Sequence, residues 1–117
     1  MSNPAVTRER DFQRLVIDAA SALGYRHYAS LYSLGSDPGY PDVTLVNPIT
    51  KRTIWLELKI TRGKVSDRQR QWIADLRAAG CAAYVVTPDD WDQIESLLRG
   101  DVDALDPATL RKDQATS

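Results

Sequence analysis

The sequence is poor in the residues that build disulfide frameworks and zinc sites, since it contains one cysteine, Cys81, and one histidine, His27. An internal disulfide is therefore excluded, and a single cysteine fits a reducing, cytoplasmic setting. One histidine and one distant cysteine do not supply the ligands of a structural zinc site. Cys81 lies between Gly80 and the apolar run that begins at Ala82, which favours a small buried side chain over a nucleophile.

Long apolar runs are also missing from this chain. No stretch approaches the roughly 20 consecutive apolar residues of a membrane helix, and the first residues lack the apolar core of a signal peptide. Hydrophobic residues make up 43% and charged residues 26% of the 117 residues, which is typical of one folded domain. We expect a single cytoplasmic domain with no membrane partner.

Charge is nearly balanced overall but unevenly distributed, with a formal net charge of −1. Residues 51–70 hold seven basic and two acidic side chains, whereas residues 87–117 hold eight acidic and three basic ones. A local excess of positive charge can attract a polyanion such as nucleic acid. A solvated loop and helix face is the alternative interpretation, which a charge run alone favours.

Hydrophobic periodicity predicts the order helix, three strands, helix, strand, helix. The first helix is expected from Arg8 to Leu23, with Thr7 as its N-cap and Gly24 as its stop. Strands are expected over residues 25–34, 42–46, 53–60 and 82–86, with further helices capped by Ser66 and opened by Pro88. Strands joined by short turns pair antiparallel, and a helical crossover can add a parallel one. The expected fold class is α/β, a mixed sheet flanked by helices.

Composition and hydrophobic periodicity divide the chain into three parts. Residues 1–6 are expected to form a flexible leader and residues 7–99 a single domain. Residues 100–117 are expected to form an acidic tail that frays.

Two short pieces of sequence, Pro41-Asp42 and Glu57-Leu58-Lys59, carry most of the functional information. A turn separates their strands, so antiparallel pairing would bring Asp42 level with Glu57 and Lys59. Glu57 and Lys59 are two residues apart on a strand, so both project from one face, about 6.5 Å apart along the chain. Pro41 limits further strand pairing and leaves the Asp42 carboxylate at the end of the sheet.

Two carboxylates and one lysine form a set that can hydrolyse a phosphodiester. Asp42 and Glu57 offer the oxygen ligands that Mg²⁺ prefers, and the carbonyl of Leu58 between Glu57 and Lys59 offers another. Lys59 can orient a water or stabilise charge on a phosphate. Taken alone, Glu57-Leu58-Lys59 also fits a half-exposed strand, and Pro41-Asp42 also fits an ordinary turn. Their combination with the basic stretch predicts a metal-dependent nuclease.

The wider sequence around these pieces resembles a known family. Gly39-Tyr40-Pro41-Asp42 followed by Leu56-Glu57-Leu58-Lys59 is similar to the PD-(D/E)xK nuclease signature. The continuation from Gly63 to Trp72, with Leu76 and Ala79-Gly80 after it, resembles the VRR-NUC branch of that superfamily, in its small stand-alone phage-type members. The similarity covers residues 8–98 and implies a restriction-endonuclease-like αβββαβ core.

The resemblance also implies a set of site residues. It implies Mg²⁺, with Mn²⁺ as a substitute, bound by Asp42, Glu57 and the Leu58 carbonyl. Lys59 would then orient the attacking water or stabilise the pentacovalent phosphate.

Two helix residues match further positions of the family. Glu9 corresponds to a glutamate that often completes the metal site and acts in catalysis, and an exposed glutamate favoured by the helix dipole is the alternative. Gln69 corresponds to a helix glutamine that holds the catalytic lysine or a phosphate, with a solvated helix position as the alternative. Trp72 is expected to pack in the core.

The function implied is a DNA endonuclease, selective for branched structures such as a four-way junction or flap and acting as a homodimer in the cytoplasm of a bacterial or phage-infected host cell. Contacts to the phosphate backbone would position the DNA without reading its bases, from Arg62, Lys64, Arg68 and Arg70. Two alternatives remain: a catalytically inactive DNA-binding or assembly module on the same fold, and a plain hairpin in an interaction protein.

Overall fold

The computed structural model describes residues 5–29 and 38–105. The elements follow one another as α1 (Glu9–Ala22), β1 (Arg26–Ala29), β2 (Val43–Asn47), β3 (Arg52–Leu58), η1 (Arg62–Lys64), α2 (Asp67–Ala78), β4 (Ala82–Val86), η2 (Pro88–Asp90) and α3 (Trp91–Leu98). The predicted order of helices and strands is confirmed. None of the helices in the described ranges is long and apolar enough to cross a membrane.

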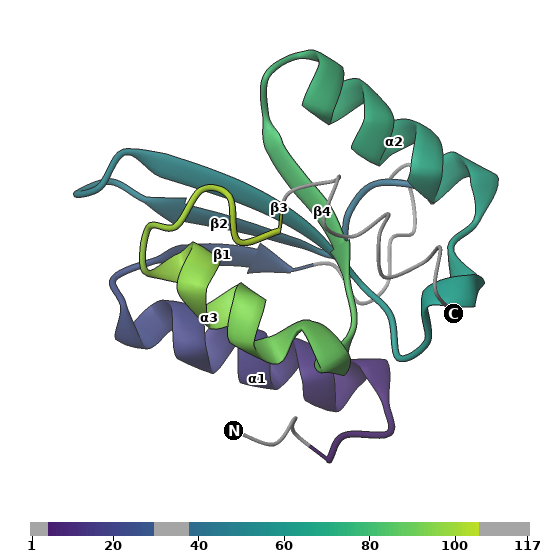
Figure 1. Cartoon of the computed structure of the whole chain (residues 1–117), viewed down its shortest axis with the longest axis horizontal. Helices are drawn as coiled ribbons and strands as arrows, with labels where there is room; N and C mark the ends of the chain where they lie inside the picture. The colour runs from purple at the N-terminus through teal and green to yellow at the C-terminus, as the bar shows by residue number, and fades with distance from the viewer. Residues whose placement is uncertain (1–4, 30–37, 106–117) are drawn as a thin grey trace.

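The four strands form one mixed sheet in the order β1-β2-β3-β4. The pairs β1–β2 and β2–β3 are antiparallel, whereas β3 and β4 are parallel and are connected through α2. Helices α1 and α3 lie together under one face of the sheet, and α2 packs against β4 on the other side (Figure 1). The predicted α/β class, a mixed sheet flanked by helices, is therefore confirmed.

The core lies between the sheet and the pair α1 and α3. Alternation along the strands turns Val43 and Leu45 of β2, and every second residue of β3, toward this layer. The helices bury against them the side chains spaced three or four residues apart, among them Phe12, Val16, Ile94 and Leu97. Burying each large aliphatic or aromatic side chain contributes roughly 1.5–3 kcal/mol.

Several element ends differ from the predicted ones; for example, β2 begins at Val43 instead of Asp42, and Pro88 opens the short helix η2, with α3 following from Trp91. The N-cap of α1 is Arg8, with no side-chain cap bond, so the predicted capping by Thr7 is wrong. The first strand spans Arg26–Ala29 instead of beginning at Tyr25, and residues 30–37 of the predicted strand and loop lie outside the described residues. The third strand ends at Leu58, before the predicted Ile60, although the backbone N–H of Lys59 still donates to the carbonyl of Val86 at 3.0 Å.

Arg52, one of the seven basic residues of the 51–70 stretch, forms hydrogen bonds at the end of α3. Its guanidinium donates to the carbonyl of Leu97 at 2.5 Å and to the hydroxyl of Tyr25 at 3.5 Å. That hydroxyl in turn donates to the carbonyl of Leu98 at 3.0 Å. The last turn of a helix leaves such carbonyls without intrahelical partners, so Arg52 and Tyr25 complete the end of α3.

The packed domain also continues past its predicted boundary. Leu105 has 0% exposure and belongs to the core, and Ala104 packs against the same cluster. Residues 100–105, assigned from their acidic composition to a fraying tail, therefore take part in the fold. The remainder of the predicted tail lies outside the described residues.

Candidate active site

The hairpin of β2 and β3 places Asp42 at the end of β3. Val43 pairs with Leu56, and continuing this register by one residue places Asp42 opposite Glu57 and Pro41 opposite Leu58. Pro41 has no N–H and β2 begins after Asp42. The N–H of Leu58 donates to Asp42 Oδ2 at 2.9 Å. A side chain thus takes the place of a strand partner, and it fixes the Asp42 carboxylate level with Glu57, as predicted.

Glu57 and Lys59 are both buried at the same end of β3, with exposures of 1% and 9%. Lys59 Nζ lies 3.3 Å from Glu57 Oε2 and 4.0 Å from Oε1 of Glu9, at the start of α1. The predicted shared face of Glu57 and Lys59 is therefore confirmed. A half-exposed strand in a plain hairpin does not fit, because both charged side chains are withdrawn from solvent.

The Glu57 carboxylate is poorly satisfied for a buried charge. Both of its oxygens are buried, and neither has a hydrogen-bond partner among the residues that the structure describes. Burial, as the largest cause, and the nearby Asp42 charge together raise the pKa of Glu57 to about 8, although the Lys59 charge lowers it. Burial also raises the pKa of Asp42, against the lowering effect of the Leu58 N–H. Neighbouring carboxyl groups with raised pKa values are typical of functional sites.

These residues fit a divalent cation. Asp42 and Glu57 supply hard oxygen donors, a bound cation would relieve the repulsion between them, and coordination would give the Glu57 carboxylate a partner in addition to the Lys59 ammonium. Within the described ranges, no three or more His, Cys, Asp or Glu side chains gather into a metal-holding group. Glu9 lies beside Lys59, and its predicted part in the metal site stays a prediction. The Leu58 carbonyl as a ligand stays a prediction.

Comparison with known proteins identifies the family. Residues 6–90 match the VRR-NUC domain. The chain belongs to the VRR-NUC domain family. It is 42% identical over 50 residues to the Fanconi-associated nuclease 1 homolog of Caenorhabditis elegans, a match that covers 43% of this chain and 6% of that protein. The chain thus corresponds to a small part of that relative.

The fold agrees with a solved structure of the family. A structure described as a VRR_NUC domain superimposes with a TM-score of 0.64 at 23% identity, covering 82% of this chain and 99% of that one. At this level of identity the match supports the fold alone. The family assignment and the fold together make this a VRR-NUC nuclease domain, as the resemblance predicted.

In this VRR-NUC domain Gln69 takes part in the start of α2. Its side-chain oxygen accepts from the N–H of Ser66 at 2.9 Å, and Ser66 Oγ accepts from the N–H of Gln69 at 3.2 Å. This reciprocal pair is a capping box, which the Ser-x-x-Gln spacing signals in sequence. The structure therefore gives Gln69 a local role, and its predicted part in catalysis stays a prediction.

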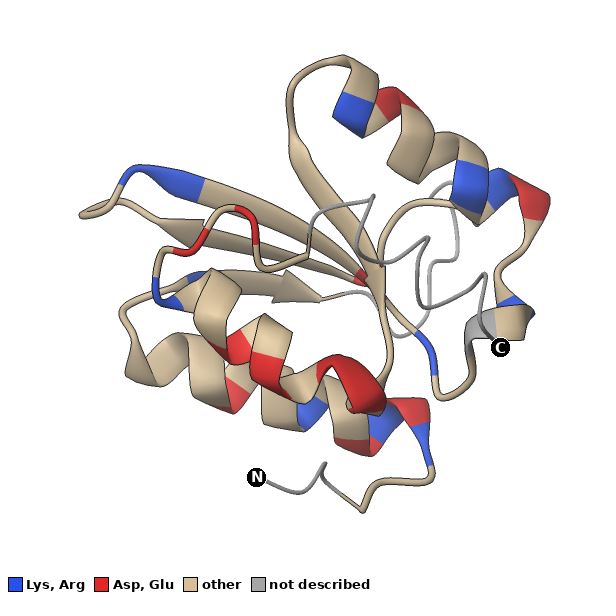
Figure 2. Cartoon of the chain, in the orientation of Figure 1, with Lys and Arg blue, Asp and Glu red and all other residues tan. Residues whose placement is uncertain are grey.

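The residues predicted to contact DNA follow the active site along the chain. Basic positions run from the end of β3 through η1 to the start of α2 (Figure 2). Lys64, Arg68 and Arg70 are exposed, and Arg70 Nη1 pairs with Asp67 Oδ1 at 3.2 Å. The Arg62 side chain lies outside the described part of the structure.

Tyr40 is a residue of the site region for which no role was predicted from the sequence. Its hydroxyl accepts from Trp55 Nε1 at 3.0 Å, and its ring meets that of Trp72 edge to face at 5.0 Å between centroids. Trp72, predicted to lie in the core, is only partly buried. Tyr40 thus ties the segment before Asp42 to both β3 and α2, a link that appears in sequence only as a tyrosine next to Pro-Asp.

Proposed function

We propose that this VRR-NUC domain is a divalent-metal-dependent DNA endonuclease that hydrolyses phosphodiester bonds at branched DNA, a four-way junction or a flap, as a homodimer. The observation that supports it most is the pair Asp42 and Glu57 beside Lys59, with buried Glu57 oxygens that lack hydrogen-bond partners among the described residues. Such an arrangement is unfavourable in a purely structural role.

Asp42 and Glu57 would hold the cation, Mg²⁺ or Mn²⁺, with the Leu58 carbonyl as a further oxygen. When bound, the cation would supply Lewis-acid activation of the phosphate and of water. The protein's own contribution is to keep the two carboxylates side by side. The Leu58 N–H orients Asp42, and the burial of Glu57 at the end of β3 restricts its movement.

Lys59 would stabilise the negative charge that develops on the scissile phosphate. Its ammonium is placed by Glu57 at 3.3 Å and by Glu9 at 4.0 Å. A positive charge in a site of low polarity acts more strongly than one in water and needs no reorganisation during the reaction. Glu9 is then a positioning residue, because it acts through Lys59.

The remaining basic residues would bind the DNA backbone. Lys64, Arg68 and Arg70 are exposed next to the site and can contact phosphates. Binding of this kind weakens steeply as salt concentration rises. The domain as described has one carboxylate pair, and a two-fold dimer would present two such pairs to a symmetric junction.

Metal binding is tested first by thermal denaturation of the native protein and of Asp42→Asn, with and without Mg²⁺ or Mn²⁺. Asparagine keeps an oxygen that can accept from the Leu58 N–H but removes the charge. A cation that binds the folded state stabilises it by about 2.7 kcal/mol at 100 times its Kd, so the native protein should melt at a higher temperature with metal. Equal shifts in both proteins would contradict the site.

Cleavage is tested on labelled four-way junction, flap, single-stranded and duplex DNA, with Glu57→Gln and Lys59→Ala beside the native protein. Lys59→Ala should keep the metal-dependent thermal shift but lose about 10²–10³-fold in cleavage rate, the usual effect of removing one charge-stabilising group. A native protein that binds junctions but cuts none of these substrates with either ion would identify a catalytically inactive binding module. A monomer on a junction, measured by sedimentation, would contradict the homodimer.

A further inference from the structure

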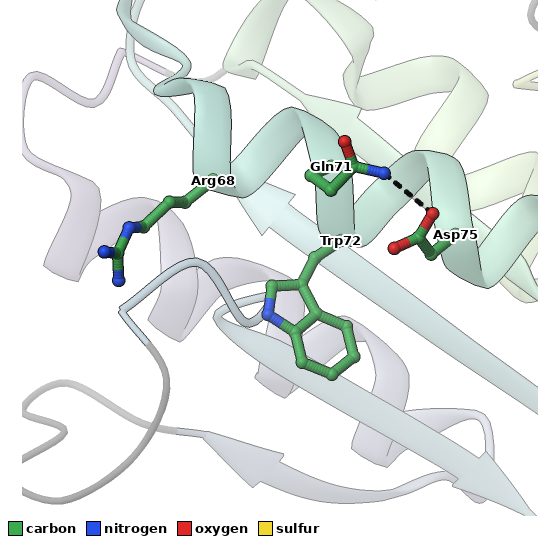
Figure 3. A pocket seen from close by; sticks show the side chains of 4 residues that line it. All are labelled: Arg68, Gln71, Trp72 and Asp75. Carbon is green, nitrogen blue, oxygen red and sulfur yellow. Dashed lines mark hydrogen bonds between the residues drawn. The ribbon is translucent and has the colours of Figure 1, made fainter.

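A hollow of about 330 Å³ lies along α2, on the side of the molecule that carries the predicted DNA contacts. It is lined by Arg68, Gln71, Trp72 and Asp75. Counted from Arg68 these positions are i, i+3, i+4 and i+7, so helical geometry places them on one stripe of α2. Figure 3 shows the indole of Trp72 extending from the helix, with Arg68 pointing to the same side and Gln71 and Asp75 joined above it. The volume falls in the range of small-molecule sites, about 300–1,000 Å³.

The indole that lines this hollow is held in place by contacts with the active-site hairpin. Trp72 packs edge to face with Tyr40, and Tyr40 is fixed by its hydrogen bond from Trp55 of β3. Tyr40 is two residues before Asp42, so the backbone path between them is at most about 7 Å. A ligand on Trp72 and a phosphate at Asp42 would therefore lie within reach of one nucleic-acid strand.

The lining of the hollow combines three kinds of group that suit a nucleotide. An aromatic face can stack on a base, and a guanidinium such as that of Arg68 can contact a phosphate. Gln71 Nε2 donates to Asp75 Oδ1 at 2.8 Å, and this pair presents amide and carboxylate groups that can bond to a base edge. An apolar peptide side chain would use the indole but would make no bond to the Arg68 guanidinium or to the remaining donors and acceptors of the Gln71–Asp75 pair.

We propose that this hollow binds an unpaired base of the DNA substrate beside the scissile phosphate. The inference rests on the proposed function only in taking DNA as the ligand. A base inside a duplex has its faces covered by its neighbours, so a stacking site of this kind favours bulged, flapped or open junction strands. The hollow would then recognise the unpaired base itself, which contacts to the phosphate backbone do not read.

The test measures binding in EDTA, so that cleavage cannot interfere. Two hairpin duplexes are compared that differ at one bulged position, which carries 2-aminopurine in one and an abasic sugar in the other. The native protein should bind the base-containing bulge about 5- to 100-fold more tightly, the usual effect of one base stacked on an aromatic side chain. The fluorescence of 2-aminopurine should fall when the base stacks on the indole.

Three variants assign the effect to this hollow. Trp72→Leu should bind both hairpins equally. Gln71→Trp changes an exposed helix position and fills the hollow, so it should also abolish the preference for the base-containing bulge. This variant replaces Trp72→Leu in the test if Trp72→Leu does not fold. Arg70→Ala removes a charge from the same helix outside the hollow. It should lower the affinity for both hairpins by the same factor and keep the preference for the base-containing bulge.

Equal binding of the two hairpins by the native protein would overturn the proposal, as would a preference that survives in a folded Trp72→Leu protein. A Gln71→Trp protein that changes its sedimentation but keeps the base preference would show that the hollow is a contact between subunits. Cleavage of the substrate panel without base preference would overturn this inference alone. Base preference without cleavage would overturn the proposed catalysis alone.

Discussion

At the scale of single residues, the properties of Glu57 depend most on its surroundings. In the sequence it is one polar residue of an alternating strand, whereas in the structure it is 1% exposed and lies next to Asp42 and Lys59. Its two neighbours act in opposite directions on its pKa, and burial outweighs the favourable charge of Lys59. A carboxyl group that is held partly protonated in the metal-free protein is ready to exchange a proton for a cation.

The stability of the metal-free protein should therefore fall as pH rises from about 5 to about 8. The pKa of Glu57 is about 8 in the folded state against an ordinary value of 4.5, so the folded state keeps a proton that the unfolded state has lost. Between these values the free energy of unfolding decreases with pH, by at most about 1.4 kcal/mol per pH unit for one group. Urea denaturation in EDTA at several pH values measures this slope.

The matched variant for this measurement is Glu57→Gln, which cannot titrate and should flatten most of the slope. The raised pKa of Asp42 acts in the same direction and accounts for the remainder. A free energy of unfolding that rises across this range in the native protein would contradict the raised pKa of Glu57.

At the scale of elements, the active site depends on how two loops join the sheet to α2. One loop contains Gly39 and Tyr40 and leads into β2. The other leads from β3 through η1 to the capping box at Ser66. Each loop is fixed by contacts with α2. The start of this helix thus positions both the segment before Asp42 and the predicted DNA contacts.

The capping box gives a direct test of whether Gln69 is structural or catalytic. Ser66→Ala and Gln69→Ala each remove one side-chain bond from the same cap, so each should lower the free energy of unfolding by about 0.5–2 kcal/mol. If capping is the only role of Gln69, both variants should lose similar amounts of cleavage activity. A much larger loss of the maximal rate in Gln69→Ala, at equal stability, would assign it a role in catalysis.

Gly39 should tolerate no larger residue, because the chain passes very close to α2 there. A Cβ atom at this position would lie 2.6 Å from the backbone oxygen of Arg68, which cannot move without moving the helix. Gly39→Ala should therefore cost roughly 1–3 kcal/mol of stability and weaken metal binding through a displaced Asp42. Thermal denaturation with and without Mn²⁺ measures both effects.

Gly63 provides the control, since a Cβ atom there would meet nothing within 4 Å. Gly63→Ala should change stability by less than about 1 kcal/mol, and it should leave the metal-dependent shift unchanged. Equal behaviour of the two alanine variants would show that the approach at Gly39 does not constrain the site.

At the scale of the whole molecule, one face of the sheet packs into the core and the other carries the predicted binding surface. The side of α1 and α3 holds the apolar core, which is completed by Leu105, while the side of α2 carries the hollow and the predicted DNA contacts. Acidic residues predominate on α3, and basic residues predominate around η1 and the start of α2 (Figure 2). Negative charge therefore lies on the side of the core helices, and positive charge lies on the side of the predicted DNA contacts.

Leu105 should matter to stability although it lies beyond the predicted end of the domain. Leu105→Ala removes a fully buried side chain and should cost about 2–5 kcal/mol, the usual range for such a change in a core. Val102→Ala is the control, because this side chain is 63% exposed and its loss should have little effect. Urea denaturation of the two variants compares them, and similar losses would place the end of the core before residue 100.

Patterns of neighbouring residues were enough to predict the order of the elements and the meeting of Asp42, Glu57 and Lys59. Alternation and helical spacing gave the order of helices and strands, and the single turn between Asp42 and Glu57 was enough to bring these residues together. The start of α2 was also predicted, because a capping serine acts within one helical turn. Each of these features depends on residues close together along the chain or joined by one hairpin.

The α/β fold, the family and the meeting of the two carboxylates at the end of β3 could therefore be predicted from local sequence patterns. The three-dimensional arrangement was needed to show that Glu57 is buried with a raised pKa, that Arg52 bonds to the end of α3, and that Leu105 belongs to the core. It was also needed to show that Tyr40 contacts both Trp55 of β3 and Trp72 of α2. The physical reason is that burial, electrostatic surroundings and packing are set by residues far apart in the chain, whose approach no local spacing encodes.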